Sequence, residues 1–355
     1  MTTFANRYVS VAVEHAYGDA QTADAYGEID EESFNETFDV LQRPDMNRYG
    51  AQKAVDSKHY ASGSFSMPLQ PDQFTMICLH GIMGIHTPGT TAGVGDKLSE
   101  SSGAALNSFT FRVGRDDKEY TFAGQVIESI SISSSVGEYA MMSVNTTGAK
   151  AQFKPSDATS IAMATLATPA YTYTGDAAHF VGAYVNFEDL ATSSAYSQFV
   201  QSIDFEISTN RDMDNSYTLG SDTCVRAPPI QLREVSGSIT FSKAILSGDV
   251  VTDEPDYLDL IRTGSYHSGT ATNPAISALF YIDATNNIRF DFHKVHYEAP
   301  QTSVSGRDTQ TMTVSFTGLY DETATEMVNI LFSSEDSTLK VVDGSTPVDI
   351  DTLSS

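Results

Sequence analysis

Apolar and polar residues alternate with a period of two in many short stretches of the chain. Phe109–Val113 and Tyr120–Phe122 flank the polar turn GRDD, and Phe280–Ile282 and Ile288–Phe292 flank ATNN. Such alternation is typical of β-strands with one buried face, and the turn residues favour hairpins. No stretch keeps a helical period beyond about a dozen residues. The pattern therefore predicts an all-β protein with a minor α component.

The strand pattern occurs twice. Residues 109–148, beginning FTFRVGRDDKEYTFAG, align without a gap with residues 279–318, beginning LFYIDATNNIRFDFHK, at a constant offset of 170. Upstream, Ser62–Phe65 (SGSF) recurs as Ser236–Ile239 (SGSI) at an offset of 174. An internal repeat of this length predicts two copies of one β-sandwich or half-barrel module.

Each copy also contains a segment suited to one short helix. Pro71–Met83 and Pro255–Arg262 both begin with proline and an acidic residue, which are favourable in a first helical turn. Gly84 and Gly264 follow, and glycine commonly ends a helix. We therefore predict one short helix in each module.

The repeat and the connecting segments predict a division of the chain. It comprises a first module at 1–150 with a long Gly/Ser/Thr-rich loop at 86–108, a linker at 151–179, a second module at 180–322, and a C-terminal tail at 323–355. Residues 18–60, which are acidic and contain tyrosines, show no duplicate and are expected to be partly loop. Loops of more than about 15 residues are uncommon unless they are functional, so 86–108 is a candidate contact between subunits.

Charge is the most distinctive feature of the composition. The 355 residues include 46 acidic and 20 basic ones, which gives a formal net charge of −26. Binding of nucleic acid requires phosphate neutralisation by Lys and Arg, so this balance argues against a DNA-binding domain. It suits a protein that works at high salt, where self-repulsion is screened, although an ordinary acidic protein is the alternative.

Targeting signals and cysteines add little. The longest apolar stretch, Met76–Ile85, is too short for a membrane span of roughly 20 residues, and the N-terminus does not resemble a secretory signal. We therefore expect no membrane association and assembly in the host cytoplasm. Cys78 and Cys224 are expected to be buried free thiols, because two cysteines do not make a disulfide framework.

No catalytic, cofactor-binding or metal-binding residue is predicted. The candidates considered are Lys97 in GVGDKL, His80 with His86, His293 with His296, and Asp212 with Asp214 and Asp222. The lysine lacks Walker spacing, and the aspartates lack the spacing and closing glutamate of an EF-hand. His293 and His296 lie three apart on an expected strand and so face opposite sides. The sequence therefore predicts a protein that is not an enzyme and has no cofactor.

Four stretches, in this order, resemble a family of tail-tube proteins from tailed viruses. They are VSVAVEHAYGD at 9–19, SGSFSMPLQPDQFTMICLHGIMG at 62–84, FAGQVIESISISSSVGEYAMMSVNTTGAK at 122–150, and IDFEISTNRDMDNSYTLGSDTCVRAPPIQLREVSGSITFSKA at 203–244. The likeness covers most of residues 8–322. The tail after Thr323 and the acidic composition depart from the family, and the latter indicates a haloarchaeal host.

The resemblance implies a structural virion protein. Expected functions are the major tail-tube subunit, whose stacked rings conduct viral DNA during ejection, or a tail-terminator or baseplate-hub protein on the same scaffold. A halophile surface or carbohydrate-binding β-sandwich is a third reading, against which the absence of Trp counts. Expected partners are other copies of the chain and other tail proteins, namely the tape measure, terminator and baseplate, while DNA passes without specific binding.

The repeat also bears on the symmetry of the ring. Tail tubes of this kind are usually sixfold, so a chain with two modules fills such a ring with three copies. We therefore expect a trimeric, pseudo-hexameric ring, with a true hexamer as the alternative. The inner β-barrel is expected to be lined by Gln125–Ser133 with Tyr139–Thr147 and by Val295–Ser303 with Gln310–Thr317.

Overall fold

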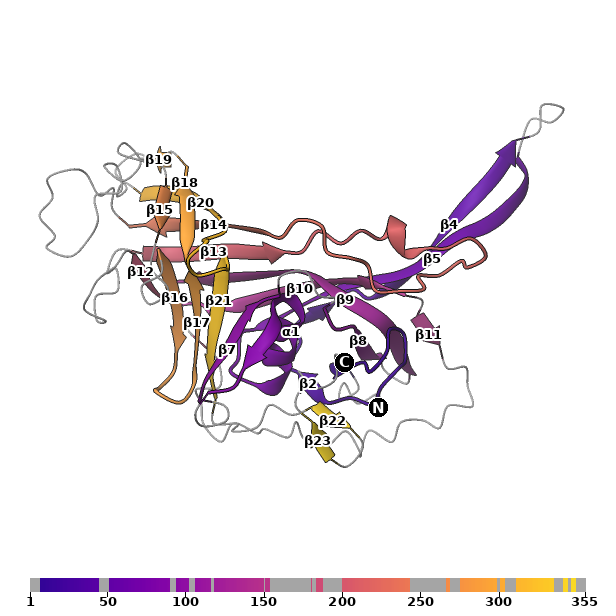
Figure 1. The fold of residues 1–355 in the computed structure, drawn as a ribbon, viewed down its shortest axis with the longest axis horizontal. Helices are drawn as coiled ribbons and strands as arrows, with labels where there is room; N and C mark the ends of the chain where they lie inside the picture. Colours follow the sequence, from indigo (N-terminus) through magenta and orange to yellow (C-terminus); the bar gives the residue numbers. More distant parts are fainter. Residues whose placement is uncertain are drawn as a thin grey trace, which may run out of the picture.

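Almost all of the secondary structure is β (Figure 1). A computed structural model describes residues 7–44, 51–89, 94–101, 106–115, 118–149, 151–153, 180, 183–187, 200–242, 266–268, 275–298, 301–303, 311–334, 341–343 and 346–348. Within these residues there is one α-helix, α1 (Gln73–Met83), and a short 3-10 helix at Asp214–Ser216. The prediction of an all-β fold with a minor helical component is confirmed. The second predicted helix, Pro255–Arg262, lies outside the described residues.

The described strands form two main sheets and one small hairpin. The large sheet contains β1 (Tyr8–Val13), β2 (Ala25–Gly27), β3 (Glu31–Glu32), β4 (Asn35–Pro44), β5 (Ala51–Pro68), β8 (Phe109–Arg115), β9 (Lys118–Ser135), β10 (Met141–Gly148), β11 (Ala151–Phe153), β13 (Val200–Ser208), β14 (Glu234–Phe241), β15 (Tyr266–Ser268), β18 (Lys294–Tyr297), β19 (Gln301–Ser303) and β20 (Thr311–Gly318). The second sheet contains β6 (Gly84–Thr87), β7 (Val94–Glu100), β12 (Tyr184–Phe187), β16 (Ile276–Tyr281), β17 (Asn287–Phe292) and β21 (Val328–Ser333). The hairpin is β22 (Val341–Asp343) with β23 (Thr346–Val348).

The large sheet joins both sequence repeats. Its main path runs β15-β18-β20-β14-β13-β9-β10-β5-β3, and every neighbouring pair along it is antiparallel. Strands β5, β9 and β10 come from the first repeat, and β14, β18 and β20 from the second. The two sets meet where β13 pairs with β9, and the long strands run side by side across the molecule (Figure 1).

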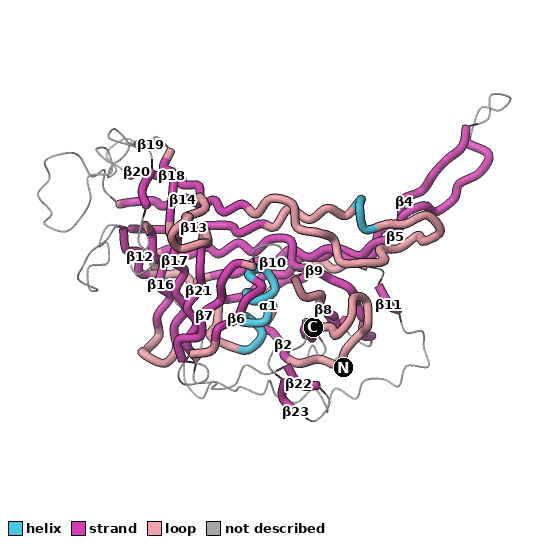
Figure 2. The backbone as a smooth tube through the Cα atoms, in the orientation of Figure 1, coloured by secondary structure: helices cyan, strands magenta, loops and turns pink. Residues whose placement is uncertain are grey.

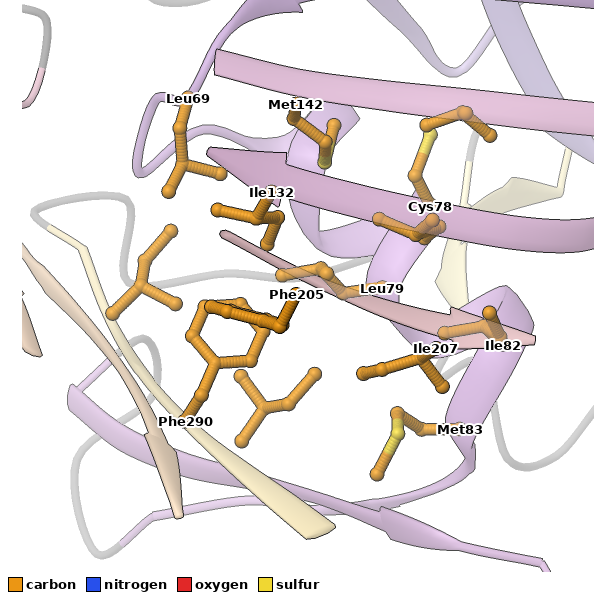
Figure 3. Packing of buried hydrophobic residues seen from close by; sticks show 14 of the residues in the cluster. Leu69, Cys78, Leu79, Ile82, Met83, Ile132, Met142, Phe205, Ile207 and Phe290 are labelled. Carbon is orange, nitrogen blue, oxygen red and sulfur yellow. The ribbon is translucent and has the colours of Figure 1, made fainter. Parts of the chain in front are cut away.

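The second sheet and α1 cover one face of the large sheet. This sheet has the order β12-β16-β17-β21-β7-β6 and crosses below the long strands, with α1 beside β7 (Figure 2). Alternating apolar residues of the long strands face this layer, as period two requires. Figure 3 shows Phe205 of β13 next to Phe290 of β17, with ring centroids 5.0 Å apart, and the α1 side chains Leu79 and Ile82 in the same core.

Helix α1 ends at Met83, as the sequence predicts, but begins at Gln73 rather than Pro71, with Asp72 as its N-cap. The Asp72 carboxylate accepts a hydrogen bond from the Thr75 amide at 2.8 Å, and burial raises the pKa of Asp72 to about 6. Gly84 has φ 96°, a left-handed conformation that glycine adopts without strain, and it ends the helix. Every residue from Phe74 to Met83 is buried, so this helix is part of the core.

The strand register reproduces the sequence repeat. Strand β20 corresponds to β10 at the offset of 170 found in the sequence. In the first copy Gly63 of β5 pairs with Thr146, and in the second Gly237 of β14 pairs with Phe316. These partners are separated by the sequence offsets of 174 and 170. The same side-by-side arrangement of these strands is therefore present twice.

The hairpins upstream of these strands do not follow the repeat. β8 pairs with β9 in the large sheet, with Phe111 opposite Phe122. β16 instead pairs with β17 in the second sheet, with Tyr281 opposite Asn287.

A β-bulge repeats with the strands. The pairing of β9 with β10 shifts register at Glu128. The pairing of β20 shifts by one residue between Tyr297 of β18 and Gln301 of β19. This interval contains Glu298, the counterpart of Glu128 at the offset of 170 that relates β10 to β20. A register shift in the corresponding part of both copies is a feature of the module rather than a local irregularity.

One further strand belongs to the repeat, although the sequence predicted no duplicate for 18–60. The segment 31–37, formed by β3 and the start of β4, pairs with β5 as β13 pairs with β14. Phe34 corresponds to Phe205 at an offset of 171, and both side chains are buried. The offset differs from 170 and 174 because the connections between strands differ in length, which hides this copy in an ungapped comparison.

Two segments differ from their predicted structure. The expected loop at 86–108 contains the whole of β7, whose Leu98 is buried and pairs with Ile330 of β21. The expected tail at 323–355 begins with β21, which lies between β17 and β7 in the second sheet. Apolar residues of both strands complete the core, but the two strands lie far apart in the sequence, so their pairing has no local signal.

Glycine in the repeated Gly-Ser strands is predicted to be essential for packing. A Cβ at Gly63 would lie 2.8 Å from the Phe34 Cα, and one at Gly237 would lie 2.8 Å from the Phe205 Cβ. Gly63→Ala and Gly237→Ala should each lower the free energy of unfolding by about 2 kcal/mol, because an overpacked site forces backbone shifts. Ser62→Ala and Ser236→Ala, on adjacent residues, are the controls and should change it by less than about 0.5 kcal/mol. Equal denaturation midpoints for glycine and serine variants would contradict the prediction.

Candidate assembly surfaces

The face of the large sheet opposite the core is polar and contains no cation over its central strands. Its outward positions on β5, β9, β10, β13, β14 and β20 are mainly Ser, Thr and Asn, with the acidic residues Asp204, Glu206 and Glu234 and with Glu128 at the bulge of β9. Neither Lys nor Arg occurs in β10, β13, β14 or β20, in β5 from Tyr60 onwards, or in β9 from Phe122 onwards. This open face spans both repeats.

Serines separate the carboxylates on the open face. Asp204 lies directly between Ser133 and Ser238, and the Ser238 hydroxyl donates to its carboxylate at 2.6 Å. Glu206 likewise lies between Ser131 and Ser236. Like charges directly opposite each other destabilise a sheet, and this arrangement avoids them while keeping the face anionic.

A shallow depression lies on the open face where β4, β5, β9, β10 and β13 come together. Its lining consists of Ser33, Asn35, Thr37, Ser62, Gly63, Ser64, Glu128, Ser129, Asn145, Thr146, Glu206 and Ser208. Several of these polar groups bind one another, for example the Asn145 amide, which donates to the Ser129 hydroxyl at 2.9 Å. Two carboxylates and no cation line it, so it would not retain a polyanion.

Strands β4 and β5 extend beyond the sheet as a two-stranded arm (Figure 1). Large apolar side chains on this arm are exposed, with fractional exposures of 49% for Phe38, 65% for Leu41 and 61% for Val55. Apolar groups that cluster on a projecting element are typical of a contact with another molecule. Sequence analysis did not identify this arm, although the apolar residues of TFDVL within an acidic segment were an available signal.

The arm is fixed at its base by loop residues that the sequence raised as candidate metal ligands. Asp214 forms an ion pair with Lys58 at 2.5 Å, and the Asp222 carbonyl accepts from the His59 amide at 2.7 Å. Asp212 accepts hydrogen bonds from Asn215, which lower the pKa of this carboxyl group. These aspartates therefore shape the loop and hold the arm.

Both ends of the large sheet are available for pairing. At one end, β3 and the start of β4 pair only with β5 among the described strands. At the other end, β19 pairs only with β20 among the described strands. Unpaired edges offer backbone donors and acceptors to another chain, and folded proteins normally protect them.

Buried carboxylates attach the C-terminal strand to the rest of the protein. Glu326, just before β21, accepts from Lys97 of β7 at 2.8 Å and from Asn329 at 3.1 Å, and it lies 3.3 Å from His293. Burial opposes ionisation of Glu326, but these partners lower its pKa to about 2. Glu100 of β7 accepts from the amides of Met327 and Val328, and burial raises its pKa.

The other sequence candidates are dispersed. Lys97 and His293 both contact Glu326, His86 lies 3.2 Å from Asp96, and His80 is buried in α1. His296 lies in β18, and Cys78 and Cys224 are buried free thiols, as predicted. The described residues contain no group of three or more His, Cys, Asp or Glu placed to hold a metal ion. No helix among them is long and apolar enough to cross a membrane.

An open polar face, two unpaired sheet edges and an apolar arm define a structural β-subunit that is completed by association with other chains. A sequence model of the phage tail tube protein family matches residues 5–242, more than half of the chain, and the chain belongs to this family. Membership makes the protein a structural component of the virion tail. No curated protein matches the chain.

Acid should loosen the attachment of β21. Glu326→Gln should lower the free energy of unfolding at pH 7 by about 2 kcal/mol, because it removes an ionised carboxylate whose pKa is depressed in the folded state. This stabilisation is present above the unfolded pKa of about 4.5 and is lost as the pH falls towards 2, so the difference between wild type and variant should shrink with acidification. Denaturant titrations at pH 7 and pH 3 measure it. Glu322→Gln, at an exposed site, is the matched control and should behave as wild type at both pH values.

Proposed function

We propose that this protein is the major tail-tube subunit, whose copies close into rings and stack head to tail to form the conduit for viral DNA. The observation that carries the proposal is the continuous sheet, whose open face has no Lys or Arg over its central strands and which has an unpaired edge at each end. Joining such edges from copy to copy closes a barrel whose inner face is the open face. The core-facing layer of α1 and the second sheet then lies outside.

The chemistry of the open face suits passage of DNA. DNA binding is dominated by contacts between cations and phosphates, and their release is slow when many form at once. A lumen whose central strands carry hydroxyls and spaced carboxylates offers few such contacts and repels the polyanion weakly. The lining then includes β9 with β10, and β13 and β14, which carry Asp204 and Glu206. It also includes β18–β20, where Lys294 at the start of β18 is the one lysine of these described strands.

The arm supports stacking between rings. Because β4 and β5 project past the sheet, their exposed apolar residues reach beyond the body of one subunit (Figure 1). Repeated heterologous contacts of this kind produce an open stack rather than a closed dimer. The tape measure, terminator and baseplate proteins would contact the ends of that stack.

Purified protein should form hollow tubes whose rings contain three chains. The two modules, which we place at 1–150 and 180–322, each supply one-sixth of a pseudo-hexameric ring. Negative-stain electron microscopy tests the tube, and mass measurement of isolated rings together with the rotational symmetry of tube cross-sections tests the stoichiometry. Six chains per ring would overturn the trimer but leave the tube intact. Single capped rings without stacking would instead support a tail-terminator or baseplate-hub role.

High salt should favour the tube. The net charge of −26 generates self-repulsion, and each copy added to a ring increases it. We infer a halophilic, archaeal host from this charge. Light scattering should show assembly falling as the salt concentration is lowered from the molar range to about 0.1 M, where the Debye length is about 10 Å. Assembly that is unchanged over this range would contradict a halophilic origin without affecting the tube.

A further inference from the structure

The contact between the two repeats is itself a strand pairing. β13 and β9 are antiparallel, and paired residue numbers add up to 337, as for Phe205 and Ile132. Two hydrogen bonds bracket this pair, from Val136 N–H to the Gln201 carbonyl at 3.0 Å and from Thr209 N–H to the Glu128 carbonyl at 2.9 Å. Bonded pairs recur at every second residue, so the N–H and C=O of Phe205 point towards β9.

The first repeat contains the counterpart of β13 at the edge of the sheet. Residues 31–37 correspond to 202–208, and Phe34 corresponds to Phe205. The Ser33 amide donates inwards to the Ser64 carbonyl at 2.8 Å. By the same alternation, the N–H and C=O of Phe34 point away from β5, towards the open edge.

Two side chains of the same chain bind these outward groups. Glu32 accepts from the Phe34 N–H at 3.0 Å, and Arg115 donates to the Phe34 carbonyl at 2.7 Å. Arg115 also binds Glu32 through two hydrogen bonds, at 2.8 Å and 2.7 Å. The pair thus occupies, in the single chain, the backbone groups that Phe205 uses to bind β9.

The opposite end of the sheet contains the counterpart of β9. Gln301–Ser303 of β19 correspond to Ser131–Ser133, and they pair with β20 in the same register as those residues pair with β10. In β9 the second edge of this stretch pairs with β13. Among the described residues, no strand occupies the second edge of β19.

We infer that residues 31–37 of one copy pair with β19 of the next copy, in the register that joins β13 to β9 within the chain. Residues 31–37 come 171 positions before their counterparts in β13, and β19 comes 170 positions after its counterpart in β9. The residue numbers of each proposed pair therefore add up to 336, one less than the 337 of the pairs between β13 and β9. Ser33 is then opposite Ser303, Phe34 opposite Thr302, and Asn35 opposite Gln301. The inference rests on the proposed function, because it names the contact that closes the ring.

The Glu32–Arg115 pair must leave Phe34 for this contact to form. Until then it covers an edge that could otherwise pair with any exposed strand, which is a common protection against wrong association. The equivalent strand β13 has no such need, because β9 of the same chain is always present. Closure therefore exchanges two side-chain contacts for a strand pairing that already exists once in each chain.

Cysteine cross-linking tests the register. Ser33→Cys protein mixed with Ser303→Cys protein, assembled and mildly oxidised, should give a covalent dimer, because paired residues lie within the roughly 7 Å that a disulfide spans. Asn35→Cys mixed with Ser303→Cys is the control, two residues out of register and about 7–8 Å apart, and should give several-fold less dimer. Circular dichroism confirms that each variant is folded.

The outcomes separate this contact from the function. Tubes with efficient linking of the 33–303 mixture support both. Tubes in which the 33–303 mixture links no better than the control overturn the register and leave the tube function intact. Wild-type protein that forms neither rings nor tubes overturns the proposed function itself.

Removing the Arg115 side chain from the Phe34 carbonyl supplies a second test. Arg115→Gln should lower the protein concentration needed for assembly by about fivefold, because one hydrogen bond no longer competes with strand pairing. Arg112→Gln removes another guanidinium of β8, one that binds Glu119 of β9 and the Gln21 carbonyl. It is the matched control and should leave that concentration unchanged. Slower assembly of the Arg115 variant than of the control variant would show that the Glu32–Arg115 pair belongs to the interface. That result would overturn the inference that the pair leaves Phe34 when the ring closes.

Discussion

The pairing of β13 with β9 is the interaction on which the rest of the architecture depends. It converts two β modules into one sheet, so that all the apolar positions of both repeats face the same layer of α1 and the second sheet. All the opposite positions then share one solvent face, because side chains alternate strictly along every strand. A slip of one residue at this junction would exchange the faces of one repeat, so that the buried Phe205 would be exposed and Asp204 would face the core.

The composition of the open face suits the proposed conduit, which makes two conflicting demands. The central strands of such a face should not attract a polyanion, which disfavours lysine and arginine, yet a sheet lined only with carboxylates would repel itself. Serine satisfies both demands, since its hydroxyl hydrates well, carries no charge and can bind a neighbouring carboxylate, as Ser238 binds Asp204. The strongly negative total charge is therefore distributed elsewhere over the surface, and the open face itself bears few charges.

Local patterns predicted much of this fold, and their limits are physical. Period two identified the long strands, glycine identified the end of α1, and the constant offset identified the repeated pairing of β10 and β20 with their neighbours. The edge strand at 31–37 escaped because its offset differs slightly and only Phe34 matches clearly. β7 and β21 escaped because each is a short strand whose partner comes from the other end of the sequence, and such pairing leaves no trace in either segment alone. The extent of the open face could not be predicted, because exposure depends on which strands lie side by side.

The two copies of the edge strand differ in a way that their covalent connection explains. β13 and β9 belong to one chain, so their effective concentration is high and independent of the amount of protein. Residues 31–37 must meet a separate molecule, so their backbone groups are exposed for as long as a free subunit exists. A protein that carries an edge in both situations needs protection only in the second, and that is where Glu32 and Arg115 bind the Phe34 backbone. Because the bond from Arg115 to Phe34 is charge-assisted, it is strong enough to cover the edge, while a whole strand of backbone hydrogen bonds can still replace it.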